Sequence, residues 1–182
     1  VVHGSRGFFA EEPRSTVVAS LERLAGLGCA VVVAGGEGRR FVIASAPVGR
    51  TELGMRGSVV VYDADTLCTP GARPLRIVTG GRDDEWFGCA LDADVRSGAL
   101  VLAVGAPGIA RALDDSGRAY VLSIPLGELD GREDPLDVDG TVGGTFIQSR
   151  LLGEPSGAVG SGELAGHAVA LFGASSAVGS PR

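Results

Sequence analysis

Short apolar runs, separated by glycine, proline and polar residues, recur along the whole chain. The run at residues 100–104 is Leu-Val-Leu-Ala-Val, apolar without alternation, which is typical of a strand buried on both faces. Comparable runs lie at residues 28–33, 41–44, 59–62, 75–78, 87–91, 119–124 and 145–149. Glycine and proline separate these runs at the intervals typical of all-β folds. The pattern therefore predicts an all-β chain of many short strands.

The strand pattern repeats with a fixed period, and such a repeat constrains the whole architecture. Residues 27–30, Leu-Gly-Cys-Ala, recur as residues 87–90, Phe-Gly-Cys-Ala, an offset of 60 residues. The same offset relates 17–18 to 77–78, 45–47 to 105–107 and 57–61 to 117–121. A third unit begins near Gly166, which follows Gly88 by 78 residues. The additional residues are expected in the polar stretches 126–139 or 153–162, because insertions belong in loops.

Each repeat unit contains four predicted strands, and the units suit a radial arrangement. Four-stranded sheets arranged radially crowd together at their inner strands, where small residues are required. Gly28 and Gly88 supply such residues. We therefore predict a partial β-propeller built of four-stranded antiparallel blades. Residues 1–26 would end a preceding blade, residues 27–80 and 87–150 would form two blades, and residues 164–182 would start a truncated one.

Residues 15–26 fit two predictions. Their apolar side chains have helical spacing, with Ser15 as a candidate N-cap and Gly26 as a stop. The 60-residue offset instead aligns residues 17–18 with residues 77–78, at the end of a predicted fourth strand. We favour the strand, because the repeat uses more information than one local window.

The spacing of the repeat carries a resemblance to a known family. Phe87-Gly88, then Gly105-Ala106-Pro107, then the strand start at residues 117–121, resemble the FG-GAP repeat. The matching positions of the first unit are Gly28 and Ala46-Pro47, with Leu27 in place of phenylalanine and Ser45 in place of glycine. FG-GAP repeats form the seven-bladed propellers of integrin α-subunits, and similar repeats occur in glycosylphosphatidylinositol-specific phospholipase D. The resemblance implies a structural role for these motif residues.

The resemblance also implies a place for calcium. In FG-GAP repeats, the loop between the first two strands often carries alternating Asp or Asn side chains that bind the ion. Here Asp92 and Asp94 supply two carboxylates, but Arg96 follows them and Val101 stands where the last Asp is expected. Calcium prefers about six to eight oxygen ligands. Asp92 and Asp94 therefore suggest a degenerate calcium loop, and an ordinary polar turn is the favoured alternative.

Composition narrows the partners of the chain. It has 16 Lys+Arg, all of them arginine, against 22 Asp+Glu, for a net charge of −6. No segment concentrates positive charge, so we expect no nucleic-acid partner. No apolar run approaches the roughly 18–20 residues of a membrane-spanning helix. Cys29, Cys68 and Cys89 form no CxxC pair, and we predict buried thiols rather than a disulfide framework or a zinc site.

Candidate catalytic residues do not assemble into a known motif. There is no G-x-S-x-G elbow, and a P-loop needs a lysine, which the chain lacks. His167 takes the repeat position of Cys29 and Cys89, so we predict a packed residue there. Asp114-Asp115 is predicted to form a turn, residues 130–135 an exposed loop, and the acidic run 83–85 to face solvent. We predict no catalytic site in this chain.

The resemblance also supplies the predicted function. It implies a non-catalytic scaffold, integrin α-like, that binds protein or glycan ligands through its loops, outside the cell or at its surface. The alternative is the C-terminal propeller region of a protein similar to glycosylphosphatidylinositol-specific phospholipase D, whose zinc catalytic domain would lie outside these residues. Two nearly complete units cannot close a ring of about four to eight blades, so the rest of a longer polypeptide is expected to complete it.

Overall fold

The computed structural model describes residues 24–50, 54–108, 117–131, 135–138, 147–152, 166–173 and 175–179. These residues form strands and turns without an α-helix, so the predicted all-β class is confirmed. The first unit contains β1 (Val31–Gly36), β2 (Arg39–Ala46), β3 (Ser58–Asp63) and β4 (Arg76–Thr79). The second contains β5 (Ala90–Arg96), β6 (Ala99–Ala106), β7 (Arg118–Pro125) and β9 (Ile147–Leu152). The remaining elements are β8 (Leu136–Asp137), β10 (Ala168–Phe172), β11 (Ser175–Gly179) and the 3₁₀ helix η2 (Leu126–Glu128).

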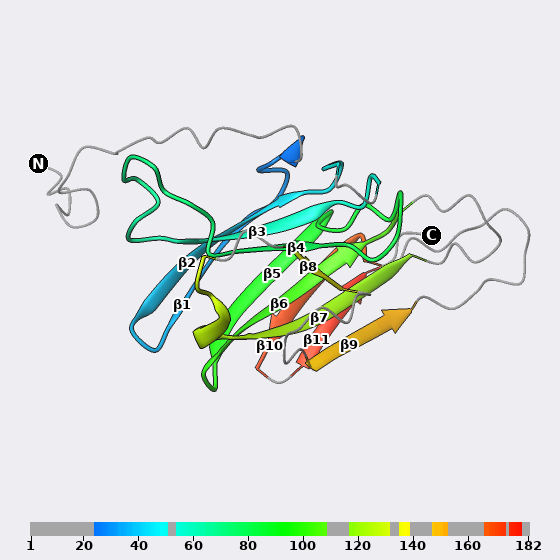
Figure 1. Cartoon of the computed structure of the whole chain (residues 1–182). Helices are drawn as coiled ribbons and strands as arrows, with labels where there is room; N and C mark the ends of the chain where they lie inside the picture. The colour runs from blue at the N-terminus through cyan, green and yellow to red at the C-terminus, as the bar shows by residue number, and fades with distance from the viewer. Residues whose placement is uncertain are drawn as a thin grey trace, which may run out of the picture.

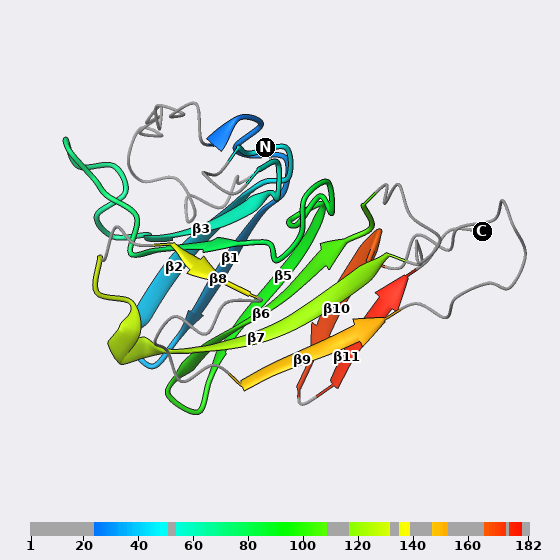
Figure 2. The same cartoon turned by 45° about the vertical axis from the view of Figure 1, so that its right-hand side comes forward.

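The strands form three sheets that follow one another in chain order (Figure 1). The first sheet has the order β1-β2-β3-β4-β8, the second has the order β5-β6-β7-β9, and β10 pairs with β11 in a hairpin. Within each unit, neighbouring strands pair antiparallel in chain order. The first strands of the three units lie side by side, β1 against β5 and β5 against β10 (Figure 2).

The first strand of each of the first two units starts later than the apolar runs predict. β1 begins at Val31 and β5 at Ala90, whereas the runs begin at residues 28 and 87. Gly28 and Gly88 have φ angles of 94° and 98°, a region that favours glycine. Their N–H groups donate to the carbonyl oxygens of Ser45 (2.8 Å) and Gly105 (2.9 Å). The Leu-Gly and Phe-Gly pairs therefore form the turn before the strand, and not the strand itself.

The connection after β7 returns to the first unit, which the sequence did not predict. Its strand β8 pairs in parallel with β4, Leu136 opposite Val78 and Asp137 opposite Thr79. The Val138 N–H donates to the Thr79 carbonyl oxygen at 3.1 Å, and the Thr79 hydroxyl donates to the Leu136 carbonyl oxygen at 3.3 Å. An insertion in the second unit therefore covers part of the outer edge of the first sheet.

The main hydrophobic core lies between the first and second sheets. The first sheet contributes Phe41, Ile43, Val59, Val61 and Val78, all fully buried. The second sheet contributes Leu100, Leu102, Val104, Tyr120 and Leu122 to the same cluster. A smaller cluster, Leu24, Ala46, Val60 and Tyr62, covers part of the opposite face of the first sheet. Sheet-on-sheet packing of this kind explains why the strands lack a polar alternation.

Adjacent units contact one another through equivalent glycines. A Cβ placed on Gly88 would lie 2.9 Å from Ser45 Cβ and 3.2 Å from the Ser58 carbonyl oxygen, both in the first unit. A Cβ on Gly166 would overlap the carbonyl group of Arg118 in the second unit, and a Cβ on Gly105 of the second unit would overlap the carbonyl group of Gly166. Gly105 and Arg118 lie 60 residues after Ser45 and Ser58. The third unit therefore packs on the second as the second packs on the first.

The predictions for residues 15–23, for Asp114-Asp115 and for residues 132–134 lie outside the described residues. Two other predictions, for the cysteines and for His167, are wrong. Cys29 and Cys68 are exposed and Cys89 is only half-buried, although buried thiols were expected. His167, expected to be packed, is exposed. Cys89 and His167 directly follow Gly88 and Gly166, and in both cases the glycine makes the close contact with the preceding unit while the next side chain does not. Cys68 lies in the connection between β3 and β4.

Candidate functional site

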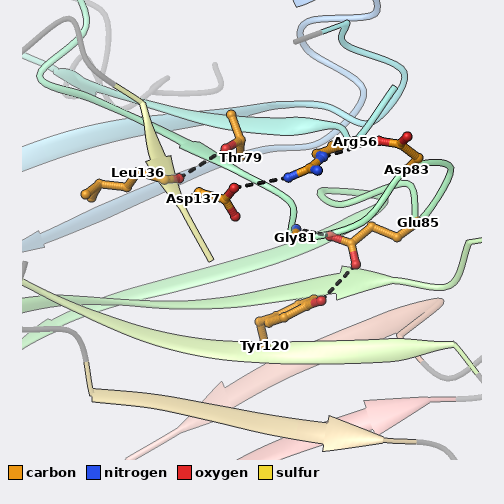
Figure 3. A network of polar contacts seen from close by, with 8 residues as sticks. All are labelled: Arg56, Thr79, Gly81, Asp83, Glu85, Tyr120, Leu136 and Asp137. Carbon is orange, nitrogen blue, oxygen red and sulfur yellow. Dashed lines mark hydrogen bonds and ion pairs between the residues drawn. The ribbon is translucent and has the colours of Figure 1, made fainter. Parts of the chain in front are cut away.

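The loops at one end of the first two sheets meet in a network of polar contacts (Figure 3). The connection between β2 and β3 supplies Arg56, and the connection between β4 and β5 supplies Gly81, Asp83 and Glu85. Strand β8 adds Asp137, and the start of β7 adds Tyr120. The Asp84 N–H donates to the Met55 carbonyl oxygen at 2.8 Å, which joins the first two connections directly. We refer to this region as the loop end.

Glu85 is the buried acceptor of this network. Its side chain is 7% exposed, whereas the acidic run 83–85 was predicted to face solvent, so that prediction is wrong for Glu85. The Tyr120 hydroxyl donates to Glu85 Oε2 at 2.8 Å, and the Gly81 N–H donates to Oε1 at 2.7 Å. Burial raises the pKa of Glu85, and these hydrogen bonds and the nearby Arg118 oppose the shift. The Glu85 carboxylate therefore holds the connection between β4 and β5 against β7.

Tyr120 completes the pair from the second sheet. Its side chain is fully buried, and its ring meets the Phe87 ring edge-on, with centroids 5.4 Å apart and planes at 69°. Burial and the Glu85 carboxylate raise the pKa of the phenol. A phenol that holds its proton this firmly is a hydrogen-bond donor and a poor nucleophile. The Glu85–Tyr120 pair therefore suits a structural role.

Arg56 links the loop end to β8. Its Nε lies 3.2 Å from Asp83 Oδ1, and its Nη1 lies 3.1 Å from Asp137 Oδ2. The Asp137 side chain is mostly buried, while Asp83 is largely exposed. An ion pair screened from solvent contributes more than an exposed one. The contact with Asp137 therefore holds β8 in place, and Asp83, although paired with Arg56, remains largely exposed.

The surface of the loop end mixes apolar and charged side chains. Val48 and Met55 are exposed large hydrophobic residues, 47% and 42% exposed. Arg82 and Asp83 are exposed beside them in the connection between β4 and β5. Protein interfaces are enriched in Met and Arg, with polar groups at their rims. The exposed part of this region has the composition of a binding surface, and its buried part fixes the loops that carry it.

The two candidate calcium ligands lie within a strand and not in a loop. Asp92 and Asp94 are part of β5, opposite Ala103 and Val101 of β6. Asp92 Oδ1 accepts from Ala93 N–H at 2.9 Å, and its Oδ2 accepts from Leu171 N–H at 2.7 Å. The latter contact joins the second sheet to β10, so Asp92 serves the packing of units.

The Asp94 carboxylate contacts the backbone of its own strand and the Arg96 side chain. Its Oδ1 accepts from the Val95 N–H at 2.9 Å, and its Oδ2 lies 3.9 Å from Arg96 Nη1. In the part of the chain that the structure describes, no three His, Cys, Asp or Glu side chains gather closely enough to hold a metal ion.

The predicted repeat-motif residues all lie at contacts between strands or units. Phe87, Ala46 and Ala106 are buried almost completely. Gly88 and Gly105 face the neighbouring units, as described above, and Pro47 and Pro107 are buried where β2 and β6 end. Gly28 occupies the matching turn of the first unit, where no atom lies within 4 Å of a Cβ placed on it. Their structural role explains why they recur.

Two features of the loop end escaped the sequence prediction. Glu85 stands in an acidic run beside Asp83 and Asp84, and such a run usually faces solvent. The signal that could have identified it is its position two residues before the buried Phe87. The Arg56–Asp137 pair joins residues 81 positions apart, and no local pattern announces such a contact.

Comparisons with protein-family models and with curated proteins find no match to this chain. Among the described residues, no helix is long and apolar enough to cross a membrane.

Proposed function

We propose that the chain is part of a β-propeller of the FG-GAP type and acts as a non-catalytic scaffold that binds a protein or glycan ligand through its loop end. The observation that carries the proposal is the repeated contact between units. Gly88 on Ser45 and Ser58 and Gly166 on Gly105 and Arg118 are the same contact, one unit apart. A constant relation between successive sheets, with their first strands side by side, generates a radial array.

The loop end is the binding surface in this proposal. Loops on a rigid scaffold carry function more often than the strands that support them. Here the contacts of Glu85 and Arg56 hold the loops in place. Met55, Arg82 and Asp83, which belong to the same loops, remain exposed. Because the buried members of the network are occupied by one another, the exposed members can contact a ligand without unfolding the support.

An integrin-like scaffold would act outside the cell or at its surface, with further blades of its polypeptide closing the ring. Binding is therefore tested with a glycan array and with immobilised collagen, fibronectin and laminin as probes, using the full chain. The proposal expects at least one probe to bind. Its binding should fall about tenfold or more in Met55→Ala and in Arg82→Ala, because truncating a residue that anchors an interface costs about 2 kcal/mol or more.

The control is a residue at the opposite end of the sheets. Ser97 lies in the β5–β6 turn with a φ of 51°, a conformation that asparagine also adopts readily. Ser97→Asn should leave the binding constant unchanged. The proposal is overturned if no probe binds, or if Ser97→Asn weakens binding as much as the loop-end variants do.

A further inference from the structure

Trp86, the single tryptophan of the chain, has a backbone conformation that favours glycine. It belongs to the connection between β4 and β5 at the loop end, and its φ is 56°. The residue 60 positions earlier is Gly26, with a φ of 79°. The two residues form the same turn, because their carbonyl oxygens accept from the Cys89 N–H at 3.1 Å and from the Cys29 N–H at 3.2 Å. The turn therefore requires a left-handed residue, and the second unit has a tryptophan there.

The side chains around this turn are exchanged between the two units. A Cβ on Gly26 would lie 3.0 Å from Val48 Cγ2, so in the first unit a valine side chain lies beside the glycine. The equivalent of Val48 is Gly108, and a Cβ there would lie 2.3 Å from Glu85 Cα. The second unit thus has no room for a side chain at position 108, and Trp86 supplies the large apolar side chain of this pair instead.

The Trp86 side chain is not part of the hydrophobic core. It is half-buried, and it is not among the side chains that form or pack against either hydrophobic cluster of the described residues. A residue other than glycine at this φ costs folding free energy, and core packing does not offset that cost here. Backbone strain of this kind is found at sites that bind ligands. Trp86 is therefore better suited to contact a ligand than to fill the interior.

The neighbours of Trp86 indicate the class of ligand. The flat face of an indole ring binds the C–H face of a sugar ring, whose hydroxyls then need donors and acceptors nearby. Arg82 is exposed in the same connection, and the Asp83 side chain is 63% exposed, so both kinds of group are present. A cationic ligand also stacks on tryptophan, but Arg82 would repel it. The opposite charges of Arg82 and Asp83 therefore favour a neutral glycan.

We infer that Trp86 is the stacking platform of a site for neutral glycans at the loop end. The sugar ring lies against the indole, and its hydroxyls accept from Arg82 and donate to Asp83. The inference rests on the proposed function, because it names one class of ligand for the same surface. A ligand that is a protein would leave the proposed function intact and would contradict this inference.

The test compares variants of Trp86 in the full chain. An array of neutral oligosaccharides identifies the glycan probe, and calorimetric titration gives its dissociation constant. Trp86→Gly removes the ring and restores the residue found at position 26, and it should bind the probe about tenfold or more weakly, as expected for an anchoring aromatic residue. Trp86→Phe keeps a ring and should lose less. Phe172→Ala, which removes a ring that is 88% exposed on β10, is the control and should bind as the wild type does.

Two further measurements separate a ligand contact from a packing role. Because Trp86 is the single tryptophan, the glycan probe should shift the tryptophan emission of the wild type. In urea unfolding followed by circular dichroism, Trp86→Gly should have a midpoint close to or above that of the wild type, because glycine relieves the strain at this φ. A markedly lower midpoint, or a variant that does not fold, would show that the ring is needed for packing and would overturn the inference.

The failures of the two proposals are distinguishable. If collagen, fibronectin or laminin binds and no glycan does, this inference is overturned and the proposed function stands. Glycan binding that Trp86→Gly leaves unchanged also overturns it. If no probe of either kind binds, both proposals are overturned.

Discussion

At Glu85, burial and hydrogen bonding act on the same carboxylate in opposite directions. Hydrogen bonds from Tyr120, Gly81 and Arg82 and the nearby Arg118 favour the charged form, while removal from water favours the neutral form. Burial has the larger effect, so the pKa of Glu85 lies above its ordinary value. Tyr120, whose pKa is raised as well, remains a donor throughout the neutral range. The pair thus stores a pH-dependent contribution to stability inside an otherwise apolar interface.

The sign of this contribution follows from linkage. Because the folded pKa exceeds the unfolded one, the penalty from Glu85 is absent below the unfolded pKa and develops as the pH rises through the folded pKa. The free energy of unfolding of the wild type, minus that of Glu85→Gln, should therefore increase as the pH falls from about 7 to about 4. Urea unfolding at a series of pH values measures it. A difference that stays constant, or decreases, contradicts the assignment.

Tyr120→Phe provides the companion measurement. It removes a donor that favours the charged carboxylate, so the pKa of Glu85 should rise further and the pH-dependent window should extend to a higher pH. At neutral pH the loss of the buried hydrogen bond should cost about 1–3 kcal/mol. A variant as stable as the wild type, with the same pH dependence, would show that the hydrogen bond contributes nothing.

The thiols give a second prediction for individual residues. Cys29 and Cys68 are exposed, while Cys89 is half-buried and its pKa is raised by burial and by the neighbouring Cys29. Since the thiolate is the reactive form, iodoacetamide at neutral pH should modify Cys89 more slowly than Cys68. Peptide mass spectrometry after timed quenching gives the order. Faster modification of Cys89 than of Cys68 would contradict the described burial.

Sequence reasoning failed at these residues for a common reason. Small apolar neighbours suggested that Cys29, Cys89 and His167 are buried, and charged neighbours suggested that Glu85 is exposed. For Cys89 and His167 the preceding unit comes close to the glycine before them, and for Glu85 the Tyr120 hydroxyl reaches the carboxylate from β7. A local window contains neither contact.

Among the elements, β8 shows how an insertion can stabilise a neighbouring unit. Its two residues pair in parallel with β4. Asp137, the second of them, also forms an ion pair with Arg56 of the first unit. A strand edge without a partner invites pairing with other chains. The segment that leaves the second sheet after β7 therefore protects part of the first sheet's edge and ties the two units together.

Removing the Asp137 carboxylate should loosen this strand. Breaking a mostly buried ion pair costs more than the roughly 1 kcal/mol of an exposed one, so in Asp137→Ala the Val138 amide, which donates to Thr79, should exchange its hydrogen at least about fivefold faster than in the wild type. Asp83→Ala removes the exposed partner of the same Arg56 and should have little effect. Equal acceleration in the two variants would contradict the role given to Asp137.

The strands themselves were largely predictable, and β8 was not. Runs such as residues 100–104 are buried on both faces and are apolar for that reason, so they identify β6 and its equivalents. Their boundaries shifted where Gly28 and Gly88 turn the backbone before the strand begins. Leu136-Asp137 has no strand pattern of its own, and only its pairing with β4 makes it one.

For the whole molecule, the 60-residue period predicted more than any single motif. It identified equivalent positions, and the structure places the equivalent residues in equivalent contacts between units. The period could not show which surface a unit leaves uncovered, because that depends on the neighbours present. The loop end is a property of the assembled sheets.

The central claim is that successive units pack through one conserved contact, and matched glycine substitutions test it most directly. Gly28→Ala and Gly88→Ala introduce the same Cβ at the same repeat position and nearly the same φ, so their common backbone strain is about 1–2 kcal/mol. Only the Cβ on residue 88 meets the preceding unit, at Ser45 and Ser58. Urea unfolding should show Gly88→Ala to be less stable than Gly28→Ala by about 1–3 kcal/mol. Equal losses in the two variants would contradict the packing of the second unit on the first.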